Sequence, residues 1–243
     1  MTNLSRLDVI RLLAFSMLVI LPATSEARQL PPIAEQMAKT YGLDSFGQVE
    51  GIRYTFNLEL PGVKRSETWE WQPKTDTVSY KGKDKEGKAI QVTYQRSQLS
   101  SQSDAVKNKV DPAFINDQYW LLFPLHVAWD GARVTDEGMH KLPLGKTSAQ
   151  RVVVKYPSDR GYTPGDTWEL YVGTDKRVEE FVYRRGGAKK PSLVIATWEG
   201  YKTAGPLLFS TEHRGTADGK PVRISFSDVS VKLTGSENWI NAQ

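Results

Sequence analysis

Cysteine is absent from the 243 residues of the chain. Its absence excludes disulfides, thiol nucleophiles, zinc–thiolate sites and iron–sulfur clusters. It also removes the lipidated cysteine that a bacterial lipoprotein carries at its mature N-terminus. If the chain is exported to an oxidising compartment, burial of a core alone must hold its fold together.

Histidine is scarce, and the sequence contains no recognisable catalytic motif. The three histidines, His126, His140 and His213, are never three or four residues apart, which is the spacing of many helical metal pairs. A site assembled from all three by folding stays open, but we expect His126 to satisfy a hydrogen bond within a strand. Gly-x-Ser-x-Gly does not occur, and the glycines of residues 161–166 lack the Lys and Ser/Thr of a phosphate loop. We expect no catalytic residue, no metal and no cofactor.

Charge of one sign does not dominate the chain. Lys and Arg number 32 against 28 Asp and Glu, for a formal net charge of +4, and the two signs are interspersed. The richest basic groups, at residues 83–88 and 184–190, are typical of hairpin tips. Proteins that bind nucleic acid usually gather Lys and Arg on one face or arm, so we expect no nucleic-acid partner.

The N-terminus has the pattern of a secretory signal peptide. Arg6 and Arg11 precede an apolar run over residues 12–21, and Ser25-Glu26-Ala27 supplies small residues at both positions that signal peptidase requires. The alternative is an uncleaved anchor, but the run is only about half of a membrane span. We therefore expect residues 1–27 to be removed, leaving a periplasmic or secreted protein of a Gram-negative bacterium without a transmembrane anchor.

The mature chain combines one helix with many short strands. Apolar residues at helical spacing predict a helix at about Pro32 to Tyr41, inside an N-terminal arm of residues 28–50. In residues 51–243 apolar and polar residues then alternate in short segments separated by turns. This pattern predicts a largely antiparallel sheet of roughly ten strands in a single domain. The polar residues 98–109 are expected to form a loop or a weak helix.

The densest apolar cluster, Ile115 to Asp130, interrupts the strand pattern. An Asp as helix cap and Pro112 at the first helical position predict a short helix leading into it. Pro124 has no backbone donor and restricts the residue before it, so we expect a short helical or irregular piece followed by a strand. The cluster is interpreted as a buried plug around which the strands wrap.

Three aspartates bracket this plug: Asp111, Asp117 and Asp130. The preference of Asp for helix caps and turns favours structural roles. A calcium site or an acid/base pair is the alternative.

Aromatic residues are plentiful, with seven Trp, ten Tyr and eight Phe. The ordinary interpretation is a β-protein core, since aromatics favour strands and dominate core burial. The functional interpretation is an apolar cavity between the sheet and its plug, which would bind a hydrophobic ligand. The candidate lining residues, whose inward face the sequence leaves open, are Tyr54, Phe56, Trp69, Trp71, Trp120, Phe123, Trp129, Trp168 and Trp198.

Three segments resemble a family of uncharacterised exported bacterial proteins that is similar to the LolA/LolB-like lipoprotein carriers. They are Asn116 to Pro124, Gly161 to Val172 and Trp198 to Pro206. The resemblance implies a mainly β (α+β) fold in which a strongly curved antiparallel sheet forms an unclosed barrel. It also implies a hollow, covered by helices and loops, that can hold acyl chains, and it implies no catalytic residues.

These observations favour a non-enzymatic, monomeric carrier for a lipid, a lipoprotein or another hydrophobic ligand. One alternative is an exported structural or envelope-interaction protein with a filled core. A third is an exported hydrolase that uses Asp117, Asp130 and His126.

The signal peptide gives a first prediction. N-terminal sequencing of the protein recovered from the periplasm or medium should begin at Arg28, because Ala27 is the last residue before the cleavage site. Recovery of intact protein that begins at Met1, held in the membrane fraction, would contradict the prediction.

Overall fold

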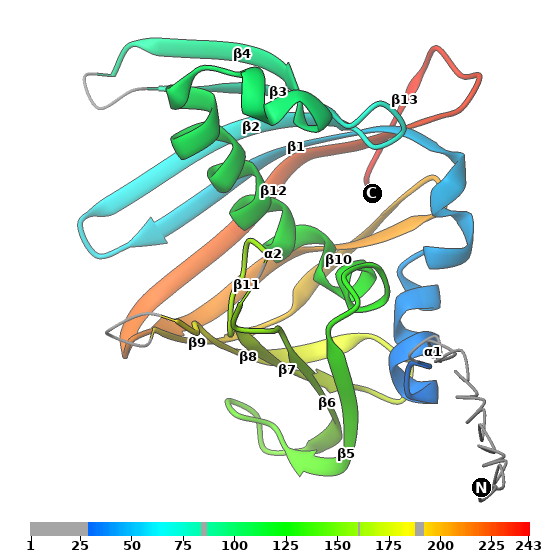
Figure 1. The fold of residues 1–243 in the computed structure, drawn as a ribbon. Coiled ribbons are helices and arrows are strands. Elements are labelled where there is room, and N and C mark those ends of the chain that lie inside the picture. The colour runs from blue at the N-terminus through cyan, green and yellow to red at the C-terminus, as the bar shows by residue number, and fades with distance from the viewer. Residues whose placement is uncertain (1–28, 84–86, 160, 188–191) are drawn as a thin grey trace, which may run out of the picture.

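The computed structural model describes residues 29–83, 87–159, 161–187 and 192–243. The expected signal peptide lies outside these residues, as do parts of the two basic tips. The described chain is mainly β: a large antiparallel sheet of 13 strands with a few helices (Figure 1).

Two meanders supply most of the sheet, and two long strands join them. The order across the sheet is β4-β3-β2-β1-β12-β11-β9-β8-β7-β6-β5. The first meander consists of β1 (Val49–Leu60), β2 (Val63–Gln72), β3 (Thr77–Lys83) and β4 (Ala89–Gln95). The second consists of β5 (Arg133–Lys141), β6 (Ser148–Lys155), β7 (Thr167–Val172), β8 (Val178–Arg184) and β9 (Leu193–Thr197). Between them lie β11 (Leu207–Ala217) and β12 (Lys220–Leu233), which pair with β10 (Glu199–Ala204) and β13 (Trp239–Asn241), respectively.

The sheet is open, and one helix connects its two edges. Among the described residues β4 pairs only with β3 and β5 only with β6, so the meanders end in free edges. The chain passes from one edge to the other through η2 (Arg96–Ser101), η3 (Val106–Val110) and α2 (Asp111–Trp129). Because it must cross the sheet to do so, α2 lies between the two meanders and against the inner face of the sheet (Figure 1).

The N-terminal helix packs against this arrangement. α1 (Pro32–Thr40) matches the expected helix, and it places Ile33, Ala34 and Met37 in the same core as α2. Gly42 follows α1 with a φ of +99°, a conformation that glycine adopts without strain. The short η1 (Leu43–Gln48) then leads directly into β1.

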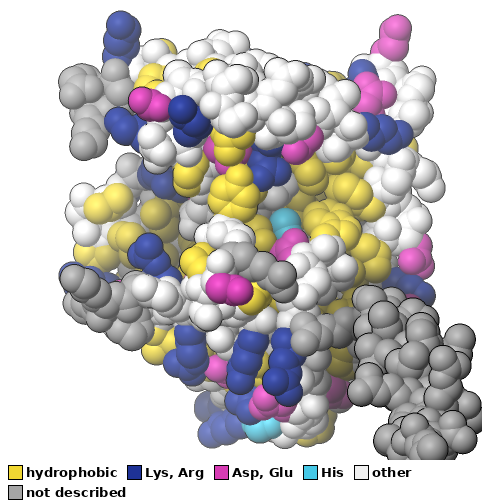
Figure 2. All heavy atoms as spheres, viewed as in Figure 1, with side chains coloured by type: hydrophobic (Ala, Val, Ile, Leu, Met, Phe, Trp, Pro, Cys, Tyr) yellow, Lys and Arg dark blue, Asp and Glu magenta, His cyan; other side chains and the backbone are white. Residues whose placement is uncertain are grey.

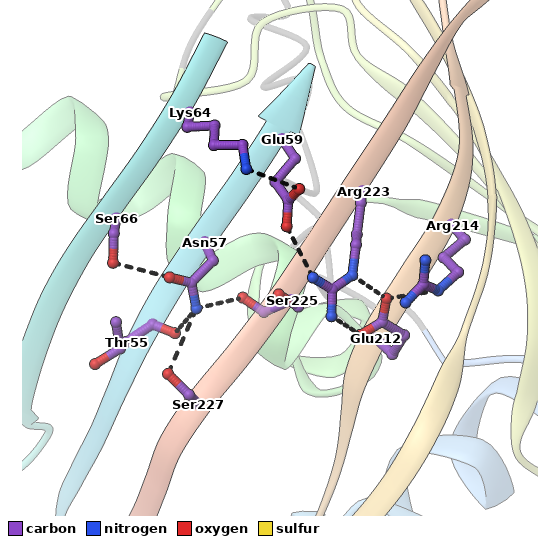
Figure 3. Close-up of polar contacts among 10 residues, drawn as sticks. All are labelled: Thr55, Asn57, Glu59, Lys64, Ser66, Glu212, Arg214, Arg223, Ser225 and Ser227. Carbon is purple, nitrogen blue, oxygen red and sulfur yellow. Dashed lines mark hydrogen bonds and ion pairs between the residues drawn. The ribbon is translucent and has the colours of Figure 1, made fainter. Parts of the chain in front are cut away.

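Strand alternation separates an apolar inner face from a polar outer face. Tyr54 and Phe56 of β1 are buried, whereas their neighbours Thr55 and Asn57 are partly exposed on the other face. Figure 3 shows this outer face over β2, β1, β12 and β11, where polar side chains bond mainly to one another. Arg223 donates two hydrogen bonds to Glu212, at 2.7 and 2.9 Å, and one to Glu59 at 2.8 Å.

The sequence pattern found ten of the strands and missed β5, β10 and β13. β5 is an edge strand with exposed or partly exposed residues throughout, and its register shifts between Asp136 and Met139. β10 is short and mostly exposed, and β13 has three residues. Strands that bury little apolar surface show little alternation, so periodicity cannot detect them.

The expectation for the plug was wrong in one respect. Residues 111–129 form a single helix with Pro124 inside it, and no strand follows Pro124 until β5. Trp129 is therefore a helical residue, and His126 is not in a strand as expected. A proline within a helix removes the hydrogen bond to the carbonyl four residues earlier, which here belongs to Trp120.

A buried histidine compensates for that missing bond. His213 on β11 is fully buried, and its Nε2 lies 2.9 Å from the carbonyl oxygen of Trp120. Its Nδ1 lies 3.2 Å from the carbonyl oxygen of Thr197. Burial lowers the pKa of His213 to about 4, although both carbonyls favour the protonated ring. The neutral ring has one N–H, which we assign to the shorter contact with Trp120.

A double-mutant cycle tests this compensation. His213→Leu should lower the free energy of unfolding by about 2 kcal/mol, because it leaves a buried carbonyl without a donor. In a Pro124→Ala background the loss should be smaller by about 1 kcal/mol, since the new amide can donate to Trp120. Urea unfolding of the four proteins measures both quantities. Equal losses in the two backgrounds would contradict the assigned role of His213.

The lowered pKa of His213 predicts a loss of stability in acid. Between the ordinary histidine pKa and about 4, the unfolded chain binds a proton that the folded protein excludes. The free energy of unfolding should therefore fall as the pH drops, with His213 contributing about 2 kcal/mol between about pH 8 and about pH 5. His213→Leu lacks this contribution, so its unfolding should depend less on pH over the same range. Parallel curves for the two proteins would refute the prediction.

Candidate functional site

One stripe of α2 is left uncovered by the sheet and lines a cavity. Pro112, Ile115, Asn116 and Tyr119 follow helical spacing and face the ends of β7, β8 and β9. The cavity has a volume of about 550 Å³, within the range of pockets that hold one small ligand. Its remaining lining residues are Trp120, Tyr162, Thr163, Pro164, Asp166, Trp168, Tyr183, Arg185, Gly186, Gly187, Ser192 and Val194.

Aromatic rings form the inner wall of this cavity, which we call the α2–β8 cavity. Trp120 of α2 lies 5.0 Å from Trp168 of β7 and 5.4 Å from Tyr183 of β8, measured between ring centroids. Trp168 also stacks on Phe123 at 3.9 Å. These contacts fix the rings in place, so the wall is formed before any ligand arrives.

Two loops meet at the rim of the cavity. Residues 163–166 form the expected tight turn: the Asp166 amide donates to the Thr163 carbonyl at 3.1 Å, and Gly165 has a φ of +76°. Gly186 approaches so closely that a Cβ there would lie 2.1 Å from Gly165. The Asp166 carboxylate holds the two loops together, because it accepts from Tyr183 Oη at 2.8 Å and from the Gly186 amide at 2.7 Å.

The first of these loops is also tied to the start of α2. Tyr162 is 52% exposed, and its hydroxyl donates to Asp111 at 2.9 Å. The other Asp111 oxygen accepts from Tyr94 at 3.0 Å and from Arg96 Nε at 2.9 Å. Asp111, which the sequence predicted to be a helix cap, is thus a buried residue that links β4, the start of α2 and the rim of the cavity.

One charged group at the cavity remains available to a ligand. Arg185 is exposed at the rim, and its guanidinium forms no ion pair with any residue that the structure places. The Trp168 indole N–H also has no acceptor among the described residues, but it is buried. The cavity therefore offers an accessible positive charge beside an aromatic wall.

A second polar cluster lies at the C-terminal end of α2. The His126 Nδ1 lies 3.0 Å from Asp130, and the hydroxyls of Tyr119 and Tyr156 also donate to that carboxylate. Burial opposes ionisation of Asp130, but these partners outweigh it and lower its pKa. His126 Nε2 is buried without a partner within the described chain. A Ser, Thr or water nucleophile beside it would be needed for hydrolysis.

The third aspartate of the expected trio lies elsewhere. Asp117 is fully buried on the side of α2 that faces β2, where it pairs with Arg65 and accepts from Trp69 Nε1 at 3.0 Å. Burial raises the pKa of Asp117 to about 8 and Glu67 adds to the rise, although the Arg65 guanidinium opposes both. Asp117 therefore does not join His126 and Asp130 in one polar site.

The nine aromatic residues singled out in the sequence all lie on the inner side of the fold. Trp120 and Trp168 line the α2–β8 cavity. The other seven, which pack in or against the main core, are Tyr54, Phe56, Trp69, Trp71, Phe123, Trp129 and Trp198. The cavity is also lined by four residues that no sequence pattern identifies: Tyr119, Tyr162, Tyr183 and Arg185. Only the fold brings these residues of α2, a loop and the end of β8 to one place.

The described residues offer neither a metal site nor a helical membrane span. They contain no group of three or more His, Asp or Glu placed to hold a metal ion. His126 lies on α2, His140 on β5 and His213 on β11, so the three histidines do not converge. Within the same residues, every helix is too short or too polar to span a bilayer.

Comparison with known proteins does not show which family this chain belongs to. No protein-family model matches the sequence, and no curated protein does either. A similar solved structure is that of a DUF1329 family protein from Desulfovibrio piger ATCC 29098, which is 9% identical with a TM-score of 0.45. The alignment covers 84% of this chain and 92% of that chain.

Proposed function

We propose that this chain is an exported, non-enzymatic binding protein that holds a hydrophobic or amphiphilic small molecule in the α2–β8 cavity. The observation that carries the proposal is a volume of about 550 Å³ beside α2, walled by fixed aromatic rings. Concave, mainly apolar sites with a few polar groups are the usual form of small-molecule sites. Figure 2 supports this view, because hydrophobic side chains reach the surface in the middle of the molecule, where α2 lies in Figure 1.

The proposal narrows the carrier function that the sequence suggested. We regard the open sheet as an unclosed barrel whose hollow is largely occupied by α2, leaving the cavity as its free part. A ligand that filled the whole hollow would have to displace buried side chains such as Phe114, Leu121 and Phe123. Exposing each would cost roughly 1.5–3 kcal/mol, so we place the ligand beside the helix rather than beneath it.

Compartment and partners belong to the same proposal. The signal peptide favours a periplasmic or secreted protein, and we propose that this protein acts as a monomer. Its ligand would come from a membrane lipid, a lipid-modified protein or another hydrophobic molecule. A cavity for one small ligand favours a single acyl chain over a fully lipidated protein.

A filled-core interaction protein is the alternative with a specific observation in its favour. Seven of the nine aromatic candidates pack in or against the core and do not line the cavity. Such a protein would bind partners through its rim or its polar outer face, and it would carry no ligand. An exported hydrolase is the third possibility, supported only by the His126–Asp130 pair and its buried, unpartnered Nε2.

Native mass spectrometry of the exported protein, purified without detergent, tests the proposal. A co-purifying amphiphile in near-stoichiometric amount is expected. Asn116→Trp, which places a large ring in the cavity from the exposed side of α2, should abolish this adduct. Gln36→Trp is the matched control, because it adds the same ring at an exposed position of α1 and should leave the adduct unchanged.

Two outcomes would count against the proposal. A clean unliganded mass for the unsubstituted protein, together with failure to take up added amphiphile, would favour the filled-core alternative. An adduct that survives in Asn116→Trp would place the ligand elsewhere.

A further inference from the structure

The α2–β8 cavity is asymmetric in charge. Among the described residues that line it, the acidic and basic side chains are those of Asp166 and Arg185. Asp166 is 4% exposed, and each of its carboxylate oxygens accepts a hydrogen bond from the protein. The carboxylate of Asp166 is thus buried and joins the rim loops, whereas Arg185 is exposed at the entrance and has no carboxylate partner within the described chain.

The neighbouring residue, Arg184, has a carboxylate partner, so the lack of one at Arg185 follows from where each side chain lies in the fold. Arg184 points to the outer face of the sheet, where its Nε lies 3.0 Å from Glu169. Arg185 is the next residue, follows the end of β8 and faces the cavity, without a carboxylate partner in the described chain. An unpaired guanidinium presents a planar set of donors that matches carboxylate and phosphate groups.

The inner end of the cavity provides a second, independent feature. Trp168 lines the cavity at its aromatic wall, and its ring lies 4.8 Å from that of Tyr183. Its indole N–H is buried, so this wall presents the faces and edges of aromatic rings to a ligand. Such a surface suits the apolar part of a ligand.

We infer that the ligand of this cavity is an anionic amphiphile. Its carboxylate or phosphate head binds Arg185 at the rim, and its apolar body lies against Trp120, Tyr183 and α2. The inference rests on the proposed function, because it specifies the ligand class of the same cavity. It does not depend on the likeness to any known protein.

Matched ligands of equal chain length test the inference. Dodecanoate, dodecyl phosphate, the neutral dodecyl glycerol ether and the cation dodecyltrimethylammonium are titrated below their micelle concentrations into delipidated, exported protein. Calorimetry gives each Kd. We expect at least one anionic ligand to bind about 5-fold or more tightly than the neutral one, the gain typical of one accessible charge-assisted contact. The cation should bind more weakly than the neutral ligand.

Two variants locate the charge that is responsible. Arg185→Gln should remove the advantage of the anionic ligands and leave the Kd of the neutral ligand unchanged. Arg184→Gln, one residue away on the outer face, should leave every Kd unchanged. If both variants reduce anionic binding equally, the effect is a general one of net charge, and the assignment to Arg185 is overturned.

The outcomes separate the inference from the proposed function. Failure of all four ligands to bind would overturn both. Equal binding of neutral and anionic ligands, blocked by Asn116→Trp, would overturn the anionic class and leave the cavity as a binding site. Preference for the cation would assign the charge selectivity to Asp166 instead.

Discussion

The fold depends on burying a helix that is apolar around most of its circumference. α2 carries buried residues on nearly every side, and a helix of this kind needs cover from all directions. Strands of both meanders, which β12 and β11 join, contact α2: Trp69 of β2 bonds to Asp117, and Trp168 of β7 packs on Trp120. α1 packs in the same core and covers part of the rest (Figure 1). The α2–β8 cavity lies where part of α2 is left uncovered, so the position of the site follows from the way in which the fold buries this helix.

Keeping α2 continuous requires support from the sheet. Pro124 deprives the Trp120 carbonyl of its usual donor, and His213 supplies one from β11 at 2.9 Å. A strand that joins the two meanders thereby holds the middle of the helix that runs between them. The adjacent Trp120 ring forms part of the cavity wall. Stability of the helix and geometry of the site are therefore coupled through one buried hydrogen bond.

Local patterns in the sequence predicted most of the fold and only part of the site. Alternation identified the long half-buried strands, and the tight turn at residues 163–166 has the hydrogen bond that its Pro-Gly pair predicts. The sequence wrongly predicted that the helix would break at Pro124, although proline does remove a backbone hydrogen bond. The Trp120 carbonyl receives a donor instead from His213, which lies 93 residues after Trp120 and 89 after Pro124. The sequence predicted Trp120 and Trp168 as lining residues of a cavity. It did not predict Arg185, because no local pattern distinguishes it from Arg184. Only the fold places Arg185 at the rim of the cavity and Arg184 on the outer face of the sheet.

Nitrogen–proton correlation spectra of the seven tryptophan indoles would test the central claim most directly. They would be recorded on delipidated protein before and after addition of dodecanoate, with the Trp168 signal assigned by Trp168→Phe. If the cavity holds the ligand, the Trp168 indole signal should change more than those of the tryptophans that do not line the cavity, because the bound chain packs against the wall that this ring helps to form. An unchanged Trp168 signal while the ligand binds would show that the cavity beside α2 is not the site.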